Sequence, residues 1–156
     1  MALTNLTTFL WFDGNTREAA EFYVNLFPES QLGPVSYYPD DAPHLSGQVL
    51  VAEFQIFGRP FAILNGGPGF PHSEAVSFQI ACDTQEDVDR LWDALIADGG
   101  EASRCGWCKD RFGVSWQVTP RALGELLGDP DPEVSGYAMK QMMQMSKIVI
   151  ADLRRS

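Results

Sequence analysis

The stretch FLWFDGNTREAAEFYVNLF, residues 9–27, is the key to the chain, because its pattern returns in FQIACDTQEDVDRLWDALI, residues 78–96. In each copy an apolar run ends at an aspartate, and a residue able to cap a helix follows, Asn15 in the first copy and Thr84 in the second. A carboxylate comes three residues after each cap, where it favours the positive end of a helix dipole. The sequence therefore predicts two strand-then-helix units.

Both copies continue with the spacing of a half-buried helix, in which apolar residues recur every three or four positions. This stripe predicts helices over residues 15–27 and 85–98. Two unrelated pieces that share ordinary capping chemistry would give a similar pattern. The residues of the stripe are Ala19, Phe22, Tyr23 and Leu26 in the first copy and Val88, Leu91, Trp92 and Leu95 in the second.

The composition indicates a globular protein with an acidic surface. A chain of 156 residues with 45% hydrophobic residues can bury one core, or two small modules that share one. The net charge of −10 offers no basic stripe for nucleic acid or for an anionic membrane, so neither is expected as a partner.

Targeting signals and cysteine usage favour the cytoplasm. No apolar run approaches the length of about 18 residues that a membrane span needs, and no signal peptide is recognisable. Three cysteines, an odd number, fit reduced thiols better than a disulfide framework.

Period-two patterns and turn residues predict the remaining elements. Strands are expected at 6–12, 31–38, 49–57 and 60–64 in the first unit, and at 75–82, 102–108 and 114–118 in the second. A helix is expected to open at Pro120. A last helix, roughly 132–145, places Val134, Ala138, Met142 and Met145 on one face, where methionines usually serve as core or dimer-interface filler.

This arrangement resembles the vicinal oxygen chelate superfamily, which includes glyoxalase I, bleomycin-resistance proteins and extradiol dioxygenases. The similarity is strongest to its PhnB-like branch, also labelled "3-demethylubiquinone-9 3-methyltransferase" domains. The resemblance implies an α+β fold in which tandem βαβββ modules form a cupped mixed sheet, with C-terminal helices and usually a homodimer. The segments that carry it are 9–23, LNGGP at 64–68, 76–95, 105–132 and the Met-rich tail.

Within this plan we expect residues 1–156 to form a single domain of the superfamily. Its parts are a first module over 5–70, a second and shorter module over 75–120, and a C-terminal helical segment over 121–156.

Methyl transfer itself is not expected. A site for S-adenosylmethionine commonly uses a glycine-rich turn between a strand and a helix. Here Gly66, Gly67 and Gly69 lead through prolines into another loop and strand, so no helix N-terminus is available to receive an anion.

No metal or other cofactor is expected either. Metal-dependent relatives place ligands on the first and last strands of each module, which the resemblance maps near Thr8, Asn65, Ser77 and Gln117. Hydroxyls and amides at these positions are weak ligands for a divalent transition metal. The loop residues His72 and Glu74 remain an alternative pair.

The Cys105-Gly106-Trp107-Cys108 motif has several readings. One CxxC supplies half of a zinc site, and redox activation relies on a helix N-terminus, whereas this motif lies on a predicted strand. Alternation would place Cys105 and Trp107 on one face of that strand and Cys108 on the other. Inert structural thiols and a pocket-lining nucleophile at Cys105 are both compatible with this placement.

The expected ligand-binding residues are Thr8, Asn65, Ser77, Trp107 and Gln117. Thr8 and Trp11 cannot both face into the cup on a regular strand, and the correspondence with ligand positions in relatives favours Thr8. Trp11 and Trp116 are either walls of the pocket or packing residues. Glu53 is either a general acid or base or a solvent-facing carboxylate.

The preferred functional hypothesis is a metal-independent homodimer that binds a small apolar or aromatic molecule. One alternative is a glyoxalase-like or dioxygenase-like enzyme with unusual metal ligands, or with thiol chemistry at Cys105. Another is an interaction module whose Met-rich C-terminal helices dock a partner.

Overall fold

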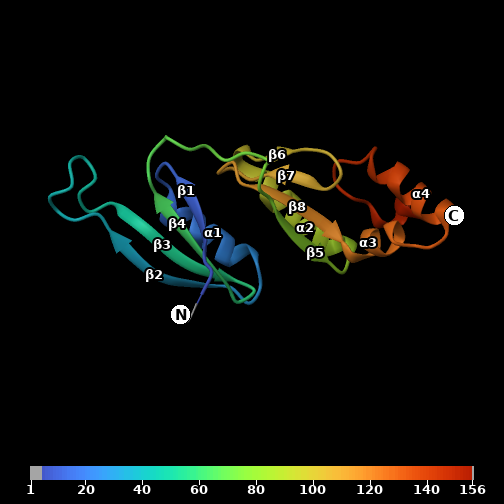
Figure 1. Ribbon diagram of the computed structural model, residues 1–156, viewed down its shortest axis with the longest axis horizontal. Coiled ribbons are helices and arrows are strands. Elements are labelled where there is room, and N and C mark those ends of the chain that lie inside the picture. The colour runs from blue at the N-terminus through green and yellow to red at the C-terminus, as the bar shows by residue number, and fades with distance from the viewer. Residues whose placement is uncertain (1–4, 156) are drawn as a thin grey trace. The chain divides into compact units, whose positions relative to one another are not determined.

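A computed structural model describes residues 5–155, and the chain divides into two compact units, Met1–Pro71 and His72–Ser156. Each unit is built on one four-stranded mixed sheet (Figure 1). The predicted α+β class with tandem modules is confirmed.

The first unit contains one sheet and one long helix. In the sheet, β1 lies at one edge and runs parallel to β4, whereas β4, β3 and β2 are antiparallel neighbours in that order. The elements are β1 (Thr8–Phe12), α1 (Thr16–Leu26), β2 (Gln31–Tyr37), β3 (Val49–Ile56) and β4 (Arg59–Asn65).

The core of the first unit lies between its sheet and α1. Leu10 is paired with Ile63 across the parallel ladder, and both are buried. The ring of Tyr23 on α1 stacks on Phe54 of β3 with centroids 5.9 Å apart. Because side chains alternate along a strand, Phe9 and its alternate neighbours occupy the opposite side. We call the side that carries Leu10 and packs on α1 the helix-packed face, and the side that carries Phe9 the open face. The same names are used for the second sheet, whose helix is α2.

The second unit repeats this connectivity. Its strand order, β5-β8-β7-β6, is that of the first sheet shifted by four strands, and β5 runs parallel to β8. A short 3-10 turn, Ala97–Gly99, follows its helix. The elements are β5 (Phe78–Cys82), α2 (Gln85–Ile96), β6 (Glu101–Ala102), β7 (Trp107–Lys109) and β8 (Ser115–Pro120).

The continuous strand predicted over 102–108 is wrong. The structure divides this stretch into β6, a turn and β7, and the turn includes Cys105 and Gly106 with φ angles of 57° and 82°. A left-handed backbone cannot continue a β-strand, so the chain reverses there. The amide of Trp107 closes the turn by donating to the carbonyl of Arg104 at 3.0 Å.

The two helix starts differ from one another. Thr84 caps α2 as predicted, since its hydroxyl accepts from the amide of Asp87 at 3.1 Å. The predicted side-chain cap at Asn15 is wrong, because this residue has φ 52° and its side chain makes no capping bond. Instead the side-chain oxygen of Asn65 accepts from the amide of Gly14 at 3.0 Å, which fixes the entry into α1.

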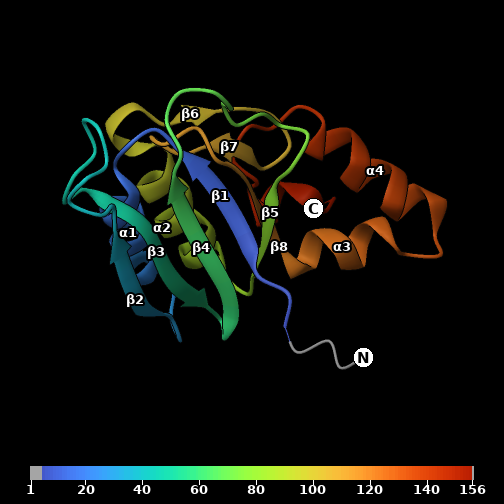
Figure 2. The same ribbon diagram turned by 60° about the vertical axis from the view of Figure 1, so that its left-hand side comes forward.

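The C-terminal helices α3 (Arg121–Leu127) and α4 (Pro132–Met142) form a small core with the final turn η2 (Ile150–Leu153). Figure 2 shows these orange and red elements grouped together. Val134, Ala138 and Met142 lie on the predicted apolar face, but the helix ends at Met142 instead of near residue 145, so Met145 packs on the core from beyond its end. Met139 and Met143 are exposed. The core comprises Leu123, Leu126, Ala138, Ile148 and Leu153, against which Val134, Met142 and Met145 pack.

Residues 145–150, which we call the C-terminal strap, bind the rest of the second unit. The amides of Cys105 and Gly106 donate to the carbonyls of Met145 and Ser146, each at 2.8 Å. On the other side, the side-chain amide of Gln85 donates to the carbonyl of Ile148 at 3.1 Å and accepts from the amide of Ile150 at 2.8 Å. The Gln85 side chain thus makes the two backbone hydrogen bonds that a neighbouring strand would otherwise make.

None of the helices within residues 5–155 combines the length and hydropathy required to cross a bilayer.

Strand β8 and the strap together leave no room for a side chain at Gly106. A Cβ there would lie 2.8 Å from the carbonyl oxygen of Val118 and 3.2 Å from a side-chain carbon of Ile148. Gly113 has a similar φ, 84°, but no atom lies within 4 Å of the corresponding Cβ position. We expect Gly106→Ala to lower the free energy of unfolding by about 3 kcal/mol and Gly113→Ala by about 1 kcal/mol, the cost of the left-handed backbone alone. Urea denaturation measures both; equal losses would contradict the close approach.

Candidate functional site

The open face of the second sheet carries a group of polar side chains. Gln117 on β8 is paired with both Gln79 on β5 and Trp107 on β7, so these three side chains lie on one face. The Gln117 side-chain amide donates to the Ser77 hydroxyl at 2.8 Å. A second bond, 3.3 Å long, joins the Gln79 amide to the Thr119 hydroxyl. Three predicted pocket residues, Ser77, Trp107 and Gln117, are therefore close neighbours.

A pocket of about 120 Å³ opens beside Trp107 at the β6–β7–β8 end of this face. Within the described part of the chain, the hydroxyl oxygen of Ser115 has no hydrogen-bond partner, although this residue is only 1% exposed. Buried polar atoms nearly always have a partner, so an unpartnered hydroxyl in a pocket wall indicates a place for a polar atom of a ligand. The lining consists of Glu74, Glu101, Ala102, Ser103, Trp107, Cys108, Lys109 and Ser115.

An ion pair stands in the wall of the same pocket. The Lys109 ammonium lies 2.5 Å from a carboxylate oxygen of Glu74. This contact lowers the pKa of Glu74 and raises the pKa of Lys109, in each case chiefly through the hydrogen bond between the two groups. The sequence suggested Glu74 and His72 as a possible metal pair, but the structure pairs this carboxylate with a lysine.

Asn65 ties together one end of the first sheet. Besides the bond to Gly14, its side-chain amide donates to the carbonyl of Val49 at 3.1 Å, and its own carbonyl accepts the Tyr38 hydroxyl at 2.6 Å. With one bond at each end of the side chain and 8% exposure, Asn65 is held firmly in place, and it also lines a pocket of about 430 Å³ at the start of α1.

Thr8 lies on the helix-packed face, and the prediction that it points into the cup is wrong. Its partner in the ladder is Phe61, whose ring stacks on Phe54 with centroids 5.4 Å apart, next to the ring of Tyr23. Trp11, three positions further on, therefore lies on the open face. Of these two residues, Trp11 and not Thr8 is thus the one on the open face.

Comparison of the two parallel ladders explains this misplacement. Thr8 pairs with Phe61 as Phe78 pairs with Trp116, so Thr8 is the counterpart of Phe78. The counterpart of Ser77 is then Thr7, and the counterpart of Gln117 is Ala62 rather than Asn65. An odd-numbered shift along a strand moves a side chain to the other face.

The tryptophans divide between the two faces. The indole N–H of Trp11 donates to the carbonyl of Gly67 at 2.7 Å, and its ring meets Phe70 edge-on with centroids 4.9 Å apart. Trp116 is 3% exposed on the helix-packed face, where its indole N–H donates to Asp110 at 2.7 Å. Trp116 is thus a packing residue, and Trp107 is the tryptophan beside the pocket.

All three cysteines are free thiols, and none is joined to another by a disulfide. Burial raises the pKa of Cys82 to about 11 and that of Cys108 to about 12. Cys105 is half-buried on the left-handed turn, with its backbone held by the strap. The prediction that Cys105 lies on a strand, on the same face as Trp107, is wrong because Cys105 is in the turn before β7.

A transition metal does not fit the residues at the four positions considered in the sequence or at their register counterparts. Thr8 and Asn65 point to the helix-packed face, and the residues that correspond to Ser77 and Gln117 in the first sheet are Thr7 and Ala62. None of these side chains is an imidazole or a carboxylate, and Ser77 and Gln117 bond to each other. Within residues 5–155 no three histidine, cysteine, aspartate or glutamate side chains form a group that could hold a metal. Glu53 is exposed on β3, paired with Ala62.

Comparison with solved structures identifies the class. The PhnB protein from Bacillus cereus is 32% identical, with a TM-score of 0.68, over 75% of this chain and 99% of that chain. The fold is shared with protein PA1353 from Pseudomonas aeruginosa (22% identity, TM-score 0.55, 76% and 98% covered). It is also shared with the fosfomycin resistance protein FosX from Mesorhizobium loti (13%, 0.51, 74% and 90%). The chain is thus similar in sequence and fold to a PhnB protein, and it shares its fold with PA1353 and FosX.

The particular family follows from the sequence. The model of the family described as 3-demethylubiquinone-9 3-methyltransferase matches residues 4–119, and the chain belongs to this PhnB-like family. A comparison with curated proteins found no match. The matched stretch ends just before α3, so the C-terminal helices and the strap lie outside it.

Thiol reactivity tests the placement of the cysteines. At pH 8, a pKa of about 11 leaves roughly one in a thousand Cys82 thiols ionised, and Cys108 is ionised less still. We expect iodoacetamide to label Cys105 alone in the folded protein and all three cysteines in urea, as measured by mass spectrometry of peptides. Native labelling of Cys108 at a similar rate would contradict the buried position of that residue.

The titration of Glu74 tests the ion pair. We expect its pKa, measured by NMR, to lie below its ordinary value of 4.5 and to rise toward that value in Lys109→Gln. Because the pKa is lowered on folding, the pair stabilises the protein above this range and is lost as the pH falls through it. Lys140→Gln, which removes an exposed lysine on α4, serves as the control and should leave the titration unchanged.

Proposed function

We propose that the protein binds a small apolar or aromatic molecule on the open face of the second sheet, without the help of a metal. The observation that carries this proposal is the unpartnered, buried hydroxyl of Ser115 in a pocket beside the ring of Trp107. Binding sites commonly combine an apolar or aromatic wall with a few oriented polar groups.

The size of the pocket limits what enters it. Drug-sized ligands occupy sites of about 300 Å³ or more, so a space of about 120 Å³ accepts only one polar group of such a molecule. A carbonyl or hydroxyl oxygen could bond to Ser115, with the apolar body resting on Trp107 and extending toward Gln117. The neighbouring Ser77–Gln117 bond keeps that amide in a fixed orientation.

Methyl transfer, which the family description names, is not part of the proposal. After β4 the chain passes through Gly66 and Gly67 into a loop and then into β5, with no helix between the two strands. An S-adenosylmethionine site of the strand–turn–helix type has no counterpart there.

We also propose a homodimer in the cytoplasm. The three unpaired cysteines are consistent with a reducing compartment. Large apolar side chains remain exposed in the first unit, where Leu6 is 88%, Phe9 61% and Phe70 66% exposed. Contiguous exposed apolar surface often marks an interface between proteins.

Native mass spectrometry of protein purified without chelators tests the assembly and the metal together. We expect a dimer without bound divalent metal. A dimer that carries about one divalent ion per chain would contradict metal-independent binding.

A matched pair of variants tests the pocket. Binding of para-substituted phenols and acetophenones is followed by ligand-observed NMR. We expect Ser115→Ala to weaken the preferred probe about three- to tenfold, the effect of one neutral hydrogen bond. Ser36→Ala, on β2 of the first unit, should leave binding unchanged. Equal affinities for wild type and Ser115→Ala would overturn the assignment of this pocket.

A further inference from the structure

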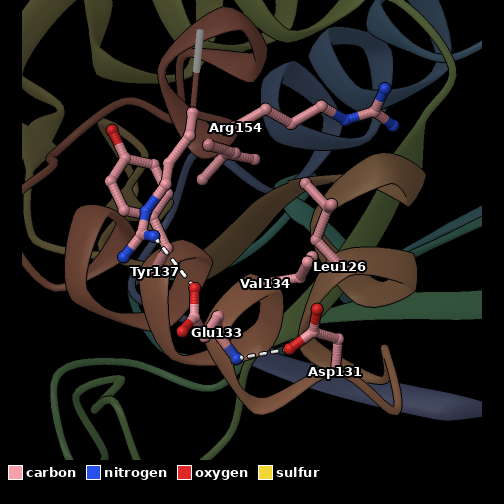
Figure 3. Close-up of a pocket in the computed structure, with 8 residues that line it drawn as sticks. Leu126, Asp131, Glu133, Val134, Tyr137 and Arg154 are labelled. Atoms are coloured by element: carbon pink, nitrogen blue, oxygen red, sulfur yellow. Dashed lines mark hydrogen bonds and ion pairs between the residues drawn. The ribbon is translucent and has the colours of Figure 1, made fainter.

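A second and larger pocket lies within the C-terminal helical segment, outside the stretch that the family shares. Its volume is about 300 Å³, and it lies between the end of α3, the first half of α4 and the residues that follow η2 (Figure 3). The lining residues are Leu126, Asp131, Glu133, Val134, Tyr137, Leu153, Arg154 and Arg155.

One side of this pocket is apolar. Leu126 and Leu153 are buried members of the C-terminal core, and Val134 packs against that core from α4. The ring of Tyr137 adds an aromatic wall. The pocket therefore offers a hydrophobic surface on which a small organic molecule could rest, at the lower end of the usual size range of ligand sites.

Three of its four charged side chains are already engaged. An Asp131 carboxylate oxygen accepts from the amide of Glu133 at 2.8 Å, which caps α4. The carboxylate of Glu133 pairs with Arg155 at 3.2 Å, and the Arg155 guanidinium also lies 5.3 Å from the centre of the Tyr137 ring. In Figure 3 these contacts occupy the side of the pocket opposite Arg154.

Arg154 is the charged group that remains. Within the described residues it makes no hydrogen bond or ion pair, and its long side chain runs along the edge of the pocket above Leu126 (Figure 3). A guanidinium presents parallel N–H donors that match the two oxygens of a carboxylate. An arginine without a partner beside an apolar wall thus complements a molecule with one anionic end and one apolar end.

We propose that this pocket binds a small organic carboxylate, with the carboxylate on Arg154 and the apolar body against Leu126, Leu153 and Tyr137. Of the two carboxylates in the lining, Glu133 is paired with Arg155 and Asp131 is engaged in capping α4, so Arg154 is the charged group left to meet a ligand. The site is independent of the open face of the second sheet, so either can be correct without the other.

The test uses the full-length protein with two probes of similar shape, benzoate and the neutral benzamide, measured by ligand-observed NMR and isothermal titration calorimetry. We expect saturable binding of benzoate, weakened by added salt because the contact is partly exposed. Arg154→Gln should lower the affinity for benzoate at least tenfold. Lys140→Gln, which removes an exposed cation on α4 outside the pocket, should have no effect.

The outcomes separate this pocket from the other site. Loss of benzoate binding in Arg154→Gln but not in Ser115→Ala supports the C-terminal pocket, and the reverse pattern overturns it. Equal affinity for benzamide and benzoate, or the absence of saturable benzoate binding, also overturns the proposal. Because Arg154 is exposed and makes no internal bond, its replacement should leave the circular dichroism spectrum unchanged, and a changed spectrum would contradict the position assigned to it.

Discussion

The carboxylate of Asp110 is the single group on which the second unit depends most. It is 2% exposed and accepts from the amides of Phe112 and Val114 and from the indole of Trp116, at 2.9, 3.1 and 2.7 Å. A buried carboxylate is tolerated only when donors surround it. These bonds fix the hairpin between β7 and β8, and that hairpin sets Trp107 and Ser115 on the same face.

The same hairpin is connected to the C-terminal strap through the Cys105–Gly106 turn. Two left-handed residues in succession direct both amides toward the strap, and the absence of a Cβ at Gly106 lets Ile148 approach. The CxxC sequence therefore forms a docking turn with one buried thiol. The helices beyond residue 120 are held to the family's shared core by backbone hydrogen bonds and by the side chain of Gln85.

Much of the fold could be predicted because its signals are local. The repeated strand–helix pattern, the Thr84 cap and the apolar stripe on α2 each depend on residues within a few positions of one another. The facing of Thr8 was not predictable, because a shift of one residue along a strand exchanges the two faces and no turn fixes the register of β1. The left-handed residues Asn15 and Cys105 lie at contacts with distant parts of the chain, because Asn65 accepts from the amide of the preceding Gly14 and the strap accepts from the amide of Cys105.

The pockets illustrate the same limit. Ser77 and Gln117 could be found from the correspondence with ligand positions in relatives, and Trp107 from the alternation of side chains along a strand. The Ser77–Gln117 bond and the pairing of Trp107 with Gln117 show that the three are neighbours. No sequence pattern pointed to Ser115, because its proposed role depends on a buried hydroxyl without a hydrogen-bond partner, and that is a property of the folded structure. The Lys109–Glu74 pair joins β7 to the loop before β5, and that loop has no periodic pattern.

The contacts of the strap can form only late in synthesis, because its residues are among the last to be translated. Gln85 and the turn at Gly106 are synthesised well before their partners near Ile148, so α2 and the β7–β8 hairpin emerge from the ribosome with an uncovered flank. Domains generally fold from the N-terminus as they are translated. The first unit can close as soon as it has emerged, whereas the contacts between the second unit and the strap form only when the last residues have been made.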